Sequence, residues 1–362
     1  MIFNKIFSKK IIFKTVVKSD LILLDKNYAN LKFEKIHSHL FNPDEYYYKE
    51  FLKSLRIYFK SFFKISFSQI YFKQLINKLD PKVAVGNEMD HRIFDFKKFY
   101  PKKIAICYQF GYIFKNDINY YKKRYKNKKV DYFFAYDLRS KAIMSKLINA
   151  RYYINGSTKV NENLPIKNNK KKYDIVFISR ARFPKKQIWK NFNNEYDKFL
   201  IKTISKYCKD HNLQLTIAFN SMRKDKKNRK GYFLKEKNFY DSVIQEYEIG
   251  KEDSFSLSHK SKLVICHNSN LGYELLFSEC KVVFIDSLSC NFNYFNSRKG
   301  PFWYYGNNTT KIVDLISSIF FQSDKMWLKE VKKINKDLVK FYNKKKIYYN
   351  NAFFKNKLKK FV

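Results

Sequence analysis

The sequence predicts an α/β protein built from two doubly wound domains that face one another across a cleft. Three observations predict this class. Short apolar runs alternate with helix-length stretches in both halves of the chain, as they do in βαβ units with buried parallel strands. The length of 362 residues exceeds what one hydrophobic core usually holds. With 8 Gly and 6 Pro, the chain favours long helices and strands over architectures that need many tight turns.

The first domain is expected over residues 1–158. Its predicted elements, in order, are a strand at Asp20–Asp25, a helical stretch from Glu45 to Leu79, and three buried strands at Val83–Gly86, Ile104–Cys107 and Tyr132–Ala135. Apolar residues recur at the helical period in the helical stretch, and each of the three short apolar runs ends in polar residues. The motif Asn155-Gly-Ser157 is expected to end a strand or to turn the chain.

A polar stretch without periodicity at residues 159–172 predicts an interdomain linker. The second domain is expected over residues 173–325. Its predicted elements are strands at Ile175–Ile178, Leu213–Phe219, Lys262–Cys266 and Val282–Asp286, and helices at Asn194–Asp210, Leu271–Glu279 and Asn308–Phe321. Alternation of strand and helix in this order predicts a doubly wound sheet. Residues 326–362 are expected to form a closing helix, Met326–Tyr342, and a basic tail.

The composition excludes several classes of protein. A hydrophobic content of 45% rules out a disordered basic tail. The sequence has no run of 18 apolar residues, so no transmembrane helix is expected. The apolar N-terminus is interrupted by lysines and lacks a small-residue cleavage site, so we expect no signal peptide and a cytoplasmic protein. The 5 Cys show no short spacing, and no His pairs with Cys or acidic residues at ligand spacing, so no metal site is expected.

The net charge of +42 admits two interpretations. Lys, Asn, Ile, Phe and Tyr are abundant while Ala, Gly and Pro are scarce, which is the skew that an AT-rich coding sequence produces. Part of the charge is then compositional. A surface this basic nevertheless attracts phosphates, nucleic acid or an anionic membrane face. Incidental basicity and a selected anionic partner both stay open at this point.

The segment His267–Glu274 follows the predicted strand Lys262–Cys266 and leads into a helix. A helix N-terminus offers free backbone N–H groups and the positive end of a dipole to an anion. Gly272 would let a ligand or the neighbouring strand approach closely. The alternative is an ordinary helix cap by Ser269 or Asn270. Glu274 is not three residues after either of them, so a capping box does not explain it.

These residues carry a resemblance to a known family. The pattern Ser269-Asn270-x-Gly272-x-Glu274, between a strand and Lys281–Ile285, resembles the donor-site element of GT-B glycosyltransferases, and Leu257–Asp286 is similar to bacterial capsule and lipopolysaccharide biosynthesis proteins. The resemblance covers Tyr173–Leu315 well. It implies two Rossmann-like domains, the first on the acceptor side and the second binding a nucleotide sugar.

The resemblance also implies an activity and a donor site. The activity is metal-independent transfer of a sugar from a nucleotide-activated donor, including CMP-linked acidic sugars, to a surface polysaccharide or lipid-linked acceptor. The nucleotide sugar is a substrate, and no cofactor is implied. The donor site would comprise His267, Asn268, Ser269, Asn270, Gly272 and Glu274. In this family the small and hydroxyl residues meet the phosphate, and the Glu meets the ribose or the sugar.

Two further segments follow predicted strands. Ser179, Arg180 and Arg182 come after Ile175–Ile178, and guanidinium donors suit phosphate oxygens, so we assign them to the donor. The alternative is a solvated basic stretch.

Glu88 and Asp90 come after the strand that begins at Val83. An inverting transferase needs a base to take the acceptor's proton, so these two are the catalytic candidates. The alternatives are a polar loop with an incidental acid pair, or a base at Asp20 or Asp25.

Other functions compete with this interpretation. The charge and the many aromatic residues suit a basic nucleic-acid-binding protein. The aromatic residues fall mainly within apolar periodic segments, however, and no nucleic-acid motif is present, so we expect no nucleic acid. A non-catalytic nucleotide-sugar-binding relative is a third interpretation. The segment Lys332–Lys360 interleaves lysines with aromatic residues, which predicts peripheral contact with the anionic inner face of the plasma membrane; a solvated basic tail is the alternative.

Overall fold

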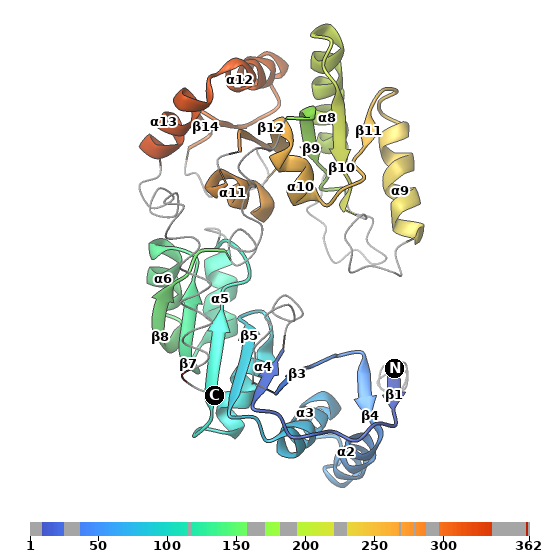
Figure 1. Cartoon of the computed structure of the whole chain (residues 1–362), viewed down its shortest axis with the longest axis vertical. Coiled ribbons are helices and arrows are strands. Elements are labelled where there is room, and N and C mark those ends of the chain that lie inside the picture. The colour runs from blue at the N-terminus through green and yellow to red at the C-terminus, as the bar shows by residue number, and fades with distance from the viewer. Residues whose placement is uncertain are drawn as a thin grey trace. The chain divides into compact units, whose positions relative to one another are not determined.

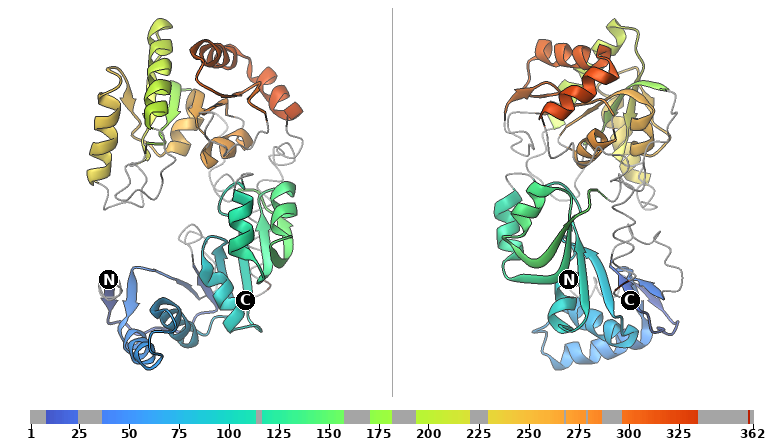
Figure 2. Two further views of the ribbon diagram at one scale, coloured as in Figure 1. Left: turned by 180° about the vertical axis from the view of Figure 1, so that it is seen from behind. Right: turned by 60° about the vertical axis from the view of Figure 1, so that its left-hand side comes forward.

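The computed structural model describes residues 9–24, 37–113, 117–157, 171–181, 194–220, 230–267, 269–278, 280–286, 297–334 and 360. The chain forms two compact units (Figures 1 and 2). The N-terminal unit comprises Met1–Tyr112, Asn119–Gly156 and Tyr349–Val362, and the C-terminal unit comprises Ile113–Ile118 and Ser157–Tyr348. Residues 158–170 of the predicted linker and nearly all of the basic tail lie outside the described residues.

The N-terminal unit is built on a six-stranded parallel sheet in the order β3-β2-β5-β6-β7-β8. The strands are β2 (Leu21–Leu23), β3 (Ser38–Leu40), β5 (Val83–Asn87), β6 (Ile104–Tyr108), β7 (Lys128–Ala135) and β8 (Ile148–Ile154). A separate pair joins β1 (Lys10–Ile12) to β4 (Glu45–Tyr47). The apolar runs that predicted β5, β6 and β7 form the buried core of the sheet, because strands covered on both faces are apolar throughout.

The helices of this unit are α2 (Tyr48–Lys60), α3 (Phe67–Leu79), α4 (His91–Phe99), α5 (Asp117–Tyr125) and α6 (Leu138–Met144). The single helical stretch predicted over Glu45–Leu79 is thus two helices. A turn at residues 61–66 separates them, and α3 begins at a new cap, Ser66, whose hydroxyl accepts the Gln69 backbone N–H. Helix α4 packs against β5, β6 and β7, and α6 packs against β7 and β8.

The C-terminal unit is built on a seven-stranded sheet in the order β11-β10-β9-β12-β13-β15-β14. The strands are β9 (Tyr173–Ile178), β10 (Leu215–Ala218), β11 (Glu248–Ile249), β12 (Ser261–Cys266), β13 (Val282–Asp286), β14 (Lys299–Gly300) and β15 (Trp303–Tyr305). All neighbours are parallel except β14 and β15. The chain runs outward from β9 to β10 and β11, then returns to place β12 on the other side of β9. The strand order therefore reverses between β9 and β12.

The helices of the C-terminal unit are α8 (Asn194–Asp210), α9 (Lys230–Asp241), α10 (Ser254–His259), α11 (Asn270–Phe277), α12 (Thr309–Phe321) and α13 (Asp324–Ile334). Helix α8 has the bounds that the sequence predicted. Helices α11 and α12 both pack against β12 and β13. Within the described part of the chain, no helix is both long enough and apolar enough to cross a membrane.

Candidate functional site

The candidate site lies at the carboxyl edge of the sheet in the C-terminal unit. Strands β9 and β12 are parallel neighbours, and Ile178 pairs with Cys266 in their register. Ser179 and Arg180 follow β9, and His267 follows β12. The structure thus brings these three predicted residues to one edge, at the point where the strand order reverses. Ligands of open α/β sheets bind outside the carboxyl ends of the strands at such a point.

The cap residue of helix α11 is Ser269, which forms no side-chain cap hydrogen bond with the described residues. Ser269 occupies the cap position with an extended backbone (φ −115°, ψ 134°), and its hydroxyl accepts no hydrogen bond from the first turn. Asn270 is the first helical residue and not the cap. An ordinary Ser or Asn cap therefore does not explain this motif. The backbone N–H groups and dipole of such a helix start favour an anion.

Gly272 serves the packing of α11 on the sheet. A Cβ atom at this position would lie 2.4 Å from Cys266 Sγ and 2.7 Å from Phe284 Cε1. Both neighbours are buried strand residues. The sequence predicted that Gly272 allows close approach by a ligand or by the neighbouring strand. The structure shows the close approach of the strands.

Glu274 lies one turn into α11, and only 2% of its surface is exposed. Its Oε1 atom accepts a hydrogen bond from the Ser157 hydroxyl at 2.9 Å. Ser157 belongs to the motif that follows β8, in which Gly156 has a φ of 72°, a left-handed conformation that favours glycine. The motif ends the strand, as predicted. It also supplies a hydrogen-bond donor to the carboxylate that the sequence assigns to ribose or sugar.

A buried ionic network joins three strand ends. His267 Nε2 lies 3.0 Å from Asp197 Oδ1, and His267 Nδ1 lies 3.8 Å from Asp286 Oδ1. The Arg180 guanidinium donates a hydrogen bond to Asp286 Oδ2 at 3.2 Å and lies 3.9 Å from Asp197 Oδ1. Asp197 comes from the first turn of α8, and Asp286 ends β13. The side chains of Asp197, Asp286 and His267 are no more than 2% exposed, so charges within the protein must balance one another there.

His267 occupies the centre of this network. Of the two carboxylates beside the ring, Asp197 is the closer, with its Oδ1 atom 3.0 Å from His267 Nε2. Phe177 and Tyr196 lie beside the imidazole, with ring centroids at 5.6 and 5.9 Å. Burial by itself raises the pKa of Asp197, but the neighbouring His267 and Arg180 outweigh burial and hold the pKa below its ordinary value. Asp197 is therefore ionised at neutral pH.

Ser179 is hydrogen-bonded within its own unit. The Tyr240 hydroxyl donates to Ser179 Oγ at 2.8 Å, and Ser179 Oγ donates to the buried Glu236 carboxylate. The Asn220 backbone N–H also donates to Glu236 Oε1, at 3.0 Å. Burial raises the pKa of Tyr240 well above its ordinary value, which keeps its hydroxyl protonated. The other two donor candidates, Arg182 and Asn268, lie outside the described residues.

The catalytic candidates follow β5 in the N-terminal unit. Glu88 is buried, and its Oε2 atom accepts the Phe110 backbone N–H at 2.7 Å. Asp90 caps α4 by accepting the Arg92 backbone N–H at 3.0 Å, and it forms an ion pair with the Arg92 guanidinium at 2.5 Å. Both carboxylates thus have partners within their own unit. Their assignment as the acceptor-side base stays a prediction, and the alternative Asp25 lies outside the described residues.

Sequence reasoning missed three buried carboxylates, Asp197, Glu236 and Asp286. Asp286 closes a predicted apolar strand, so its position at a carboxyl edge was an available signal. Asp197 and Glu236 lie on helices, three and four residues before the apolar pairs Leu200-Ile201 and Phe239-Tyr240, and this spacing places them on the buried helix faces. Only the packing of the helices brings them to the strand ends.

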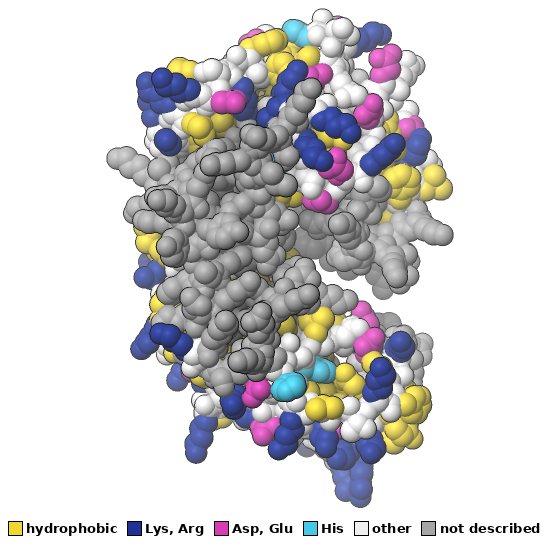
Figure 3. Space-filling view, in the orientation of Figure 1, with side chains coloured by type: hydrophobic (Ala, Val, Ile, Leu, Met, Phe, Trp, Pro, Cys, Tyr) yellow, Lys and Arg dark blue, Asp and Glu magenta, His cyan; other side chains and the backbone are white. Residues whose placement is uncertain are grey.

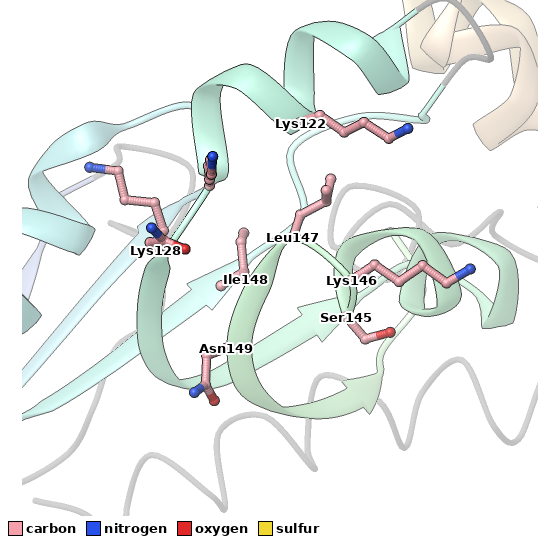
Figure 4. A pocket seen from close by; sticks show the side chains of 9 residues that line it. Lys122, Lys128, Ser145, Lys146, Leu147, Ile148 and Asn149 are labelled. Carbon is pink, nitrogen blue, oxygen red and sulfur yellow. The ribbon is translucent and has the colours of Figure 1, made fainter.

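The described residues contain no group of three His, Cys, Asp or Glu side chains that could hold a metal ion. An open pocket of about 380 Å³ lies in the N-terminal unit, and its lining includes Lys122, Lys126, Lys128 and Lys146 as well as the apolar Leu147 and Ile148 (Figure 4). Lys128 begins β7 and Ile148 begins β8, so this pocket is at the amino edge of its sheet. It does not coincide with either group of candidate residues.

Comparison with solved structures identifies the fold. The chain is similar to the UDP-GlcNAc 2-epimerase from Neisseria meningitidis bound to UDP-GlcNAc (TM-score 0.54, 13% identity, 94% of this chain and 99% of that chain). It is also similar to the UDP-GlcNAc 2-epimerase from Methanocaldococcus jannaschii in complex with UDP-GlcNAc and UDP (TM-score 0.51, 14% identity, 85% of this chain and 94% of that chain). The fold is therefore the GT-B type with two Rossmann-like domains, as the sequence predicted.

Sequence comparison gives the family. No protein of curated function matches the chain. Residues 107–361 match the model of a family described as "putative O-antigen biosynthesis protein". The match spans well over half of the chain, and it includes the carboxyl ends of β9, β12 and β13 and the start of α11. The chain therefore belongs to this O-antigen biosynthesis family.

Proposed function

We propose that the protein is a metal-independent glycosyltransferase of O-antigen synthesis, which moves a sugar from a nucleotide-activated donor to a saccharide or lipid-linked acceptor. One observation carries the proposal. Two predicted donor segments, one after β9 and one after β12, meet at the reversal of strand order in the C-terminal unit. That is where a GT-B-type α/β sheet binds its ligand.

Each part of the donor has a matching group at this edge. The start of α11, where Ser269 forms no cap hydrogen bond with the described residues, offers a dipole and backbone donors to a phosphate. We assign the Glu274 carboxylate to the ribose or sugar hydroxyls, as the sequence resemblance implies, and its Oε1 atom also accepts the Ser157 hydroxyl. Arg180 already balances Asp286, so we assign it a smaller share of phosphate binding than α11.

Two classes of donor nucleotide, CMP and UDP, are considered for this site. The enzymes that the sequence resembles include ones that use CMP-linked acidic sugars, whereas both similar structures contain UDP-GlcNAc. A donor panel of UDP- and CMP-sugars, measured by calorimetry, separates these two classes. Binding of neither class, or equal binding of single-stranded RNA, would contradict the proposal and favour the nucleic-acid alternative.

The decisive variant is Glu274→Gln, which keeps the shape of the side chain and removes its charge. Loss of a charge-assisted hydrogen bond costs about 1.5–3 kcal/mol, so donor affinity should fall by roughly 10- to 150-fold. Glu195→Gln on α8 is the matched control, because Glu195 is largely exposed and should leave affinity unchanged. Equal affinity of the two variants would place the donor elsewhere.

Turnover assays distinguish a glycosyltransferase from an epimerase and from a non-catalytic relative. Release of nucleotide only in the presence of an acceptor indicates glycosyl transfer. Conversion of the nucleotide sugar without an acceptor indicates an epimerase, the activity named for both similar structures. Donor binding without either reaction indicates a non-catalytic relative. For the transferase, replacing the true base, Glu88 or Asp90, by Ala should lower turnover by about 100-fold or more without changing donor affinity.

A further inference from the structure

Helix α2 presents three chemically different faces. Phe51, Ser54 and Tyr58 are buried on one of them. A second face carries apolar side chains, and a third face carries cations. Within each of these two faces, successive members are four, three and four residues apart, a spacing that aligns them along one side of a helix. We call them the apolar stripe (Tyr48, Leu52, Leu55 and Phe59) and the basic stripe (Lys49, Lys53, Arg56 and Lys60).

The described residues leave most of the apolar stripe uncovered, and the Phe13 ring that lies 5.0 Å from the Tyr48 ring is itself exposed. Tyr48, Leu52 and Phe59 are exposed, and Leu55 is half-buried. A single exposed apolar residue needs no explanation, but a row of them along one helix marks a binding surface.

An aromatic tip extends the apolar stripe beyond the end of α2. Phe62 and Phe63 follow the helix and are 81% and 53% exposed. Both have positive φ, 48° and 63°, a region that bulky L-residues avoid. Phe63 rests on Tyr58 with ring centroids 4.9 Å apart, while Phe62 is the most exposed large apolar residue of the described chain. The turn therefore holds two aromatic side chains outward at a conformational cost.

The exposed charges of α2 are all cations, because its one acidic residue, Glu50 in the first turn, is buried. From Phe51 to Leu79 the sequence contains no Asp or Glu, and its cations are Lys53, Arg56, Lys60, Lys64, Lys73 and Lys78. In the part of the chain that the structure describes, no residue of the basic stripe forms an ion pair. In Figure 3, Lys and Arg side chains lie beside hydrophobic ones on the lower part of the N-terminal unit.

We propose that α2 and the aromatic tip form a docking surface for an anionic phospholipid bilayer. The helix would lie in the plane of the interface, with the apolar stripe and the tip at the acyl boundary and the basic stripe among the phosphates. Aromatic side chains favour this depth, and lysine stems reach from it to the headgroups. Charge complementarity selects this partner, since a second copy of the chain would bring like charges together. This surface is distinct from the predicted contact of the basic tail.

Flotation of the full chain with vesicles tests the proposal. The chain should bind vesicles with about 30% phosphatidylglycerol and not pure phosphatidylcholine, more tightly at about 0.1 M than at about 1 M salt. Phe62→Ser/Phe63→Ser should weaken binding at least about tenfold at both salt concentrations, because it removes the inserted groups. Phe321→Ser, at another exposed aromatic residue, is the control and should change nothing.

The charge is tested separately. Arg56→Gln/Lys60→Gln should weaken binding by about 25-fold at low salt, since each cation near an anionic leaflet contributes a factor of about five. Lys202→Gln/Lys209→Gln on α8 removes the same net charge elsewhere and should have little effect. A Phe62→Trp variant should shift its fluorescence to the blue on adding anionic vesicles.

The proposal would be overturned by no binding of the parent chain, by equal losses in the control variants, or by full binding of the α2 variants. Loss of RNA binding by the α2 variants with vesicle binding intact would also overturn it.

Discussion

Replacing Asp197 by asparagine removes one charge from the buried network while keeping the shape of the side chain. Deleting one partner of a buried ion pair costs about 3–5 kcal/mol, because the other charge is left uncompensated. We expect the lower end of this range, because Arg180 remains 3.2 Å from Asp286 and continues to balance that carboxylate. A loss of about 3 kcal/mol should lower Tm by roughly 6–12 °C in a domain of about 150–250 residues.

The pH dependence gives this prediction a second, independent readout. The folded-state pKa of Asp197 lies below its ordinary value. Its contribution to stability is therefore fully present above the unfolded-state pKa of about 3.9, and it is lost as pH falls through the lower folded-state pKa. Urea unfolding followed by circular dichroism should show the largest difference between parent and Asp197→Asn at neutral pH. The two free energies of unfolding should converge in acid.

Asp210→Asn is the matched control, because Asp210 lies on the same helix. It pairs with Lys206 at 2.9 Å, and both side chains are at least half exposed, so its loss should cost no more than about 0.5 kcal/mol. Equal destabilisation by the two variants would refute the view that burial makes the Asp197 contact strong. A difference that persists unchanged in acid would refute the linkage to its ionisation.

Three further predictions concern other parts of the C-terminal unit. Gly272→Ala should lower the free energy of unfolding by about 1–3 kcal/mol, because the new methyl group overpacks the core. Gly231→Ala should raise it by about 0.5–1 kcal/mol, because nothing lies within 4 Å of the new methyl group. Urea titration measures both changes, and changes of the same sign would be inconsistent with this packing. Tyr240→Phe should cost about 1 kcal/mol, because Ser179 loses its donor, and calorimetric melting checks it against the parent. Burial lowers the pKa of His259 to about 4. As the pH falls from about 6.5 to about 4, the parent should therefore lose about 1.4 kcal/mol of folding stability per pH unit. His259→Asn should lack this pH dependence.

The fold was predictable because its strands are apolar on both faces. Runs such as Val83–Gly86 and Val282–Asp286 can be buried in few ways other than within a parallel sheet, and both are strands. The predicted and observed bounds of helix Asn194–Asp210 agree, because its apolar residues repeat with a clear 3.6-residue period. Very short strands were missed, because elements such as Glu248–Ile249 contain too few residues to show any alternation. Such short strands are held by pairing with a neighbouring strand that is distant in the sequence, and a local sequence pattern does not reveal that neighbour.

The candidate site was predictable only where a residue directly follows a strand. His267 and Ser179 do, and the structure places both at the predicted edge. The partners of these residues could not be found in this way. Asp197 and Glu236 reach the strand ends from helices that lie elsewhere in the sequence, and long-range packing determines which strand ends those helices meet.

The reversal of strand order also has a kinetic consequence. Tyr173 pairs with Ser261 across β9 and β12, and these partners are more than twice as far apart along the chain as Ile175 and Leu215, which pair across β9 and β10. Doubling a loop adds only about 0.6 kcal/mol to its closure entropy at equilibrium. Pairings between distant segments nevertheless slow folding. The edge that holds Ser179 and His267 is thus completed by a slow, long-range step, after the strands that flank it have had time to pair locally.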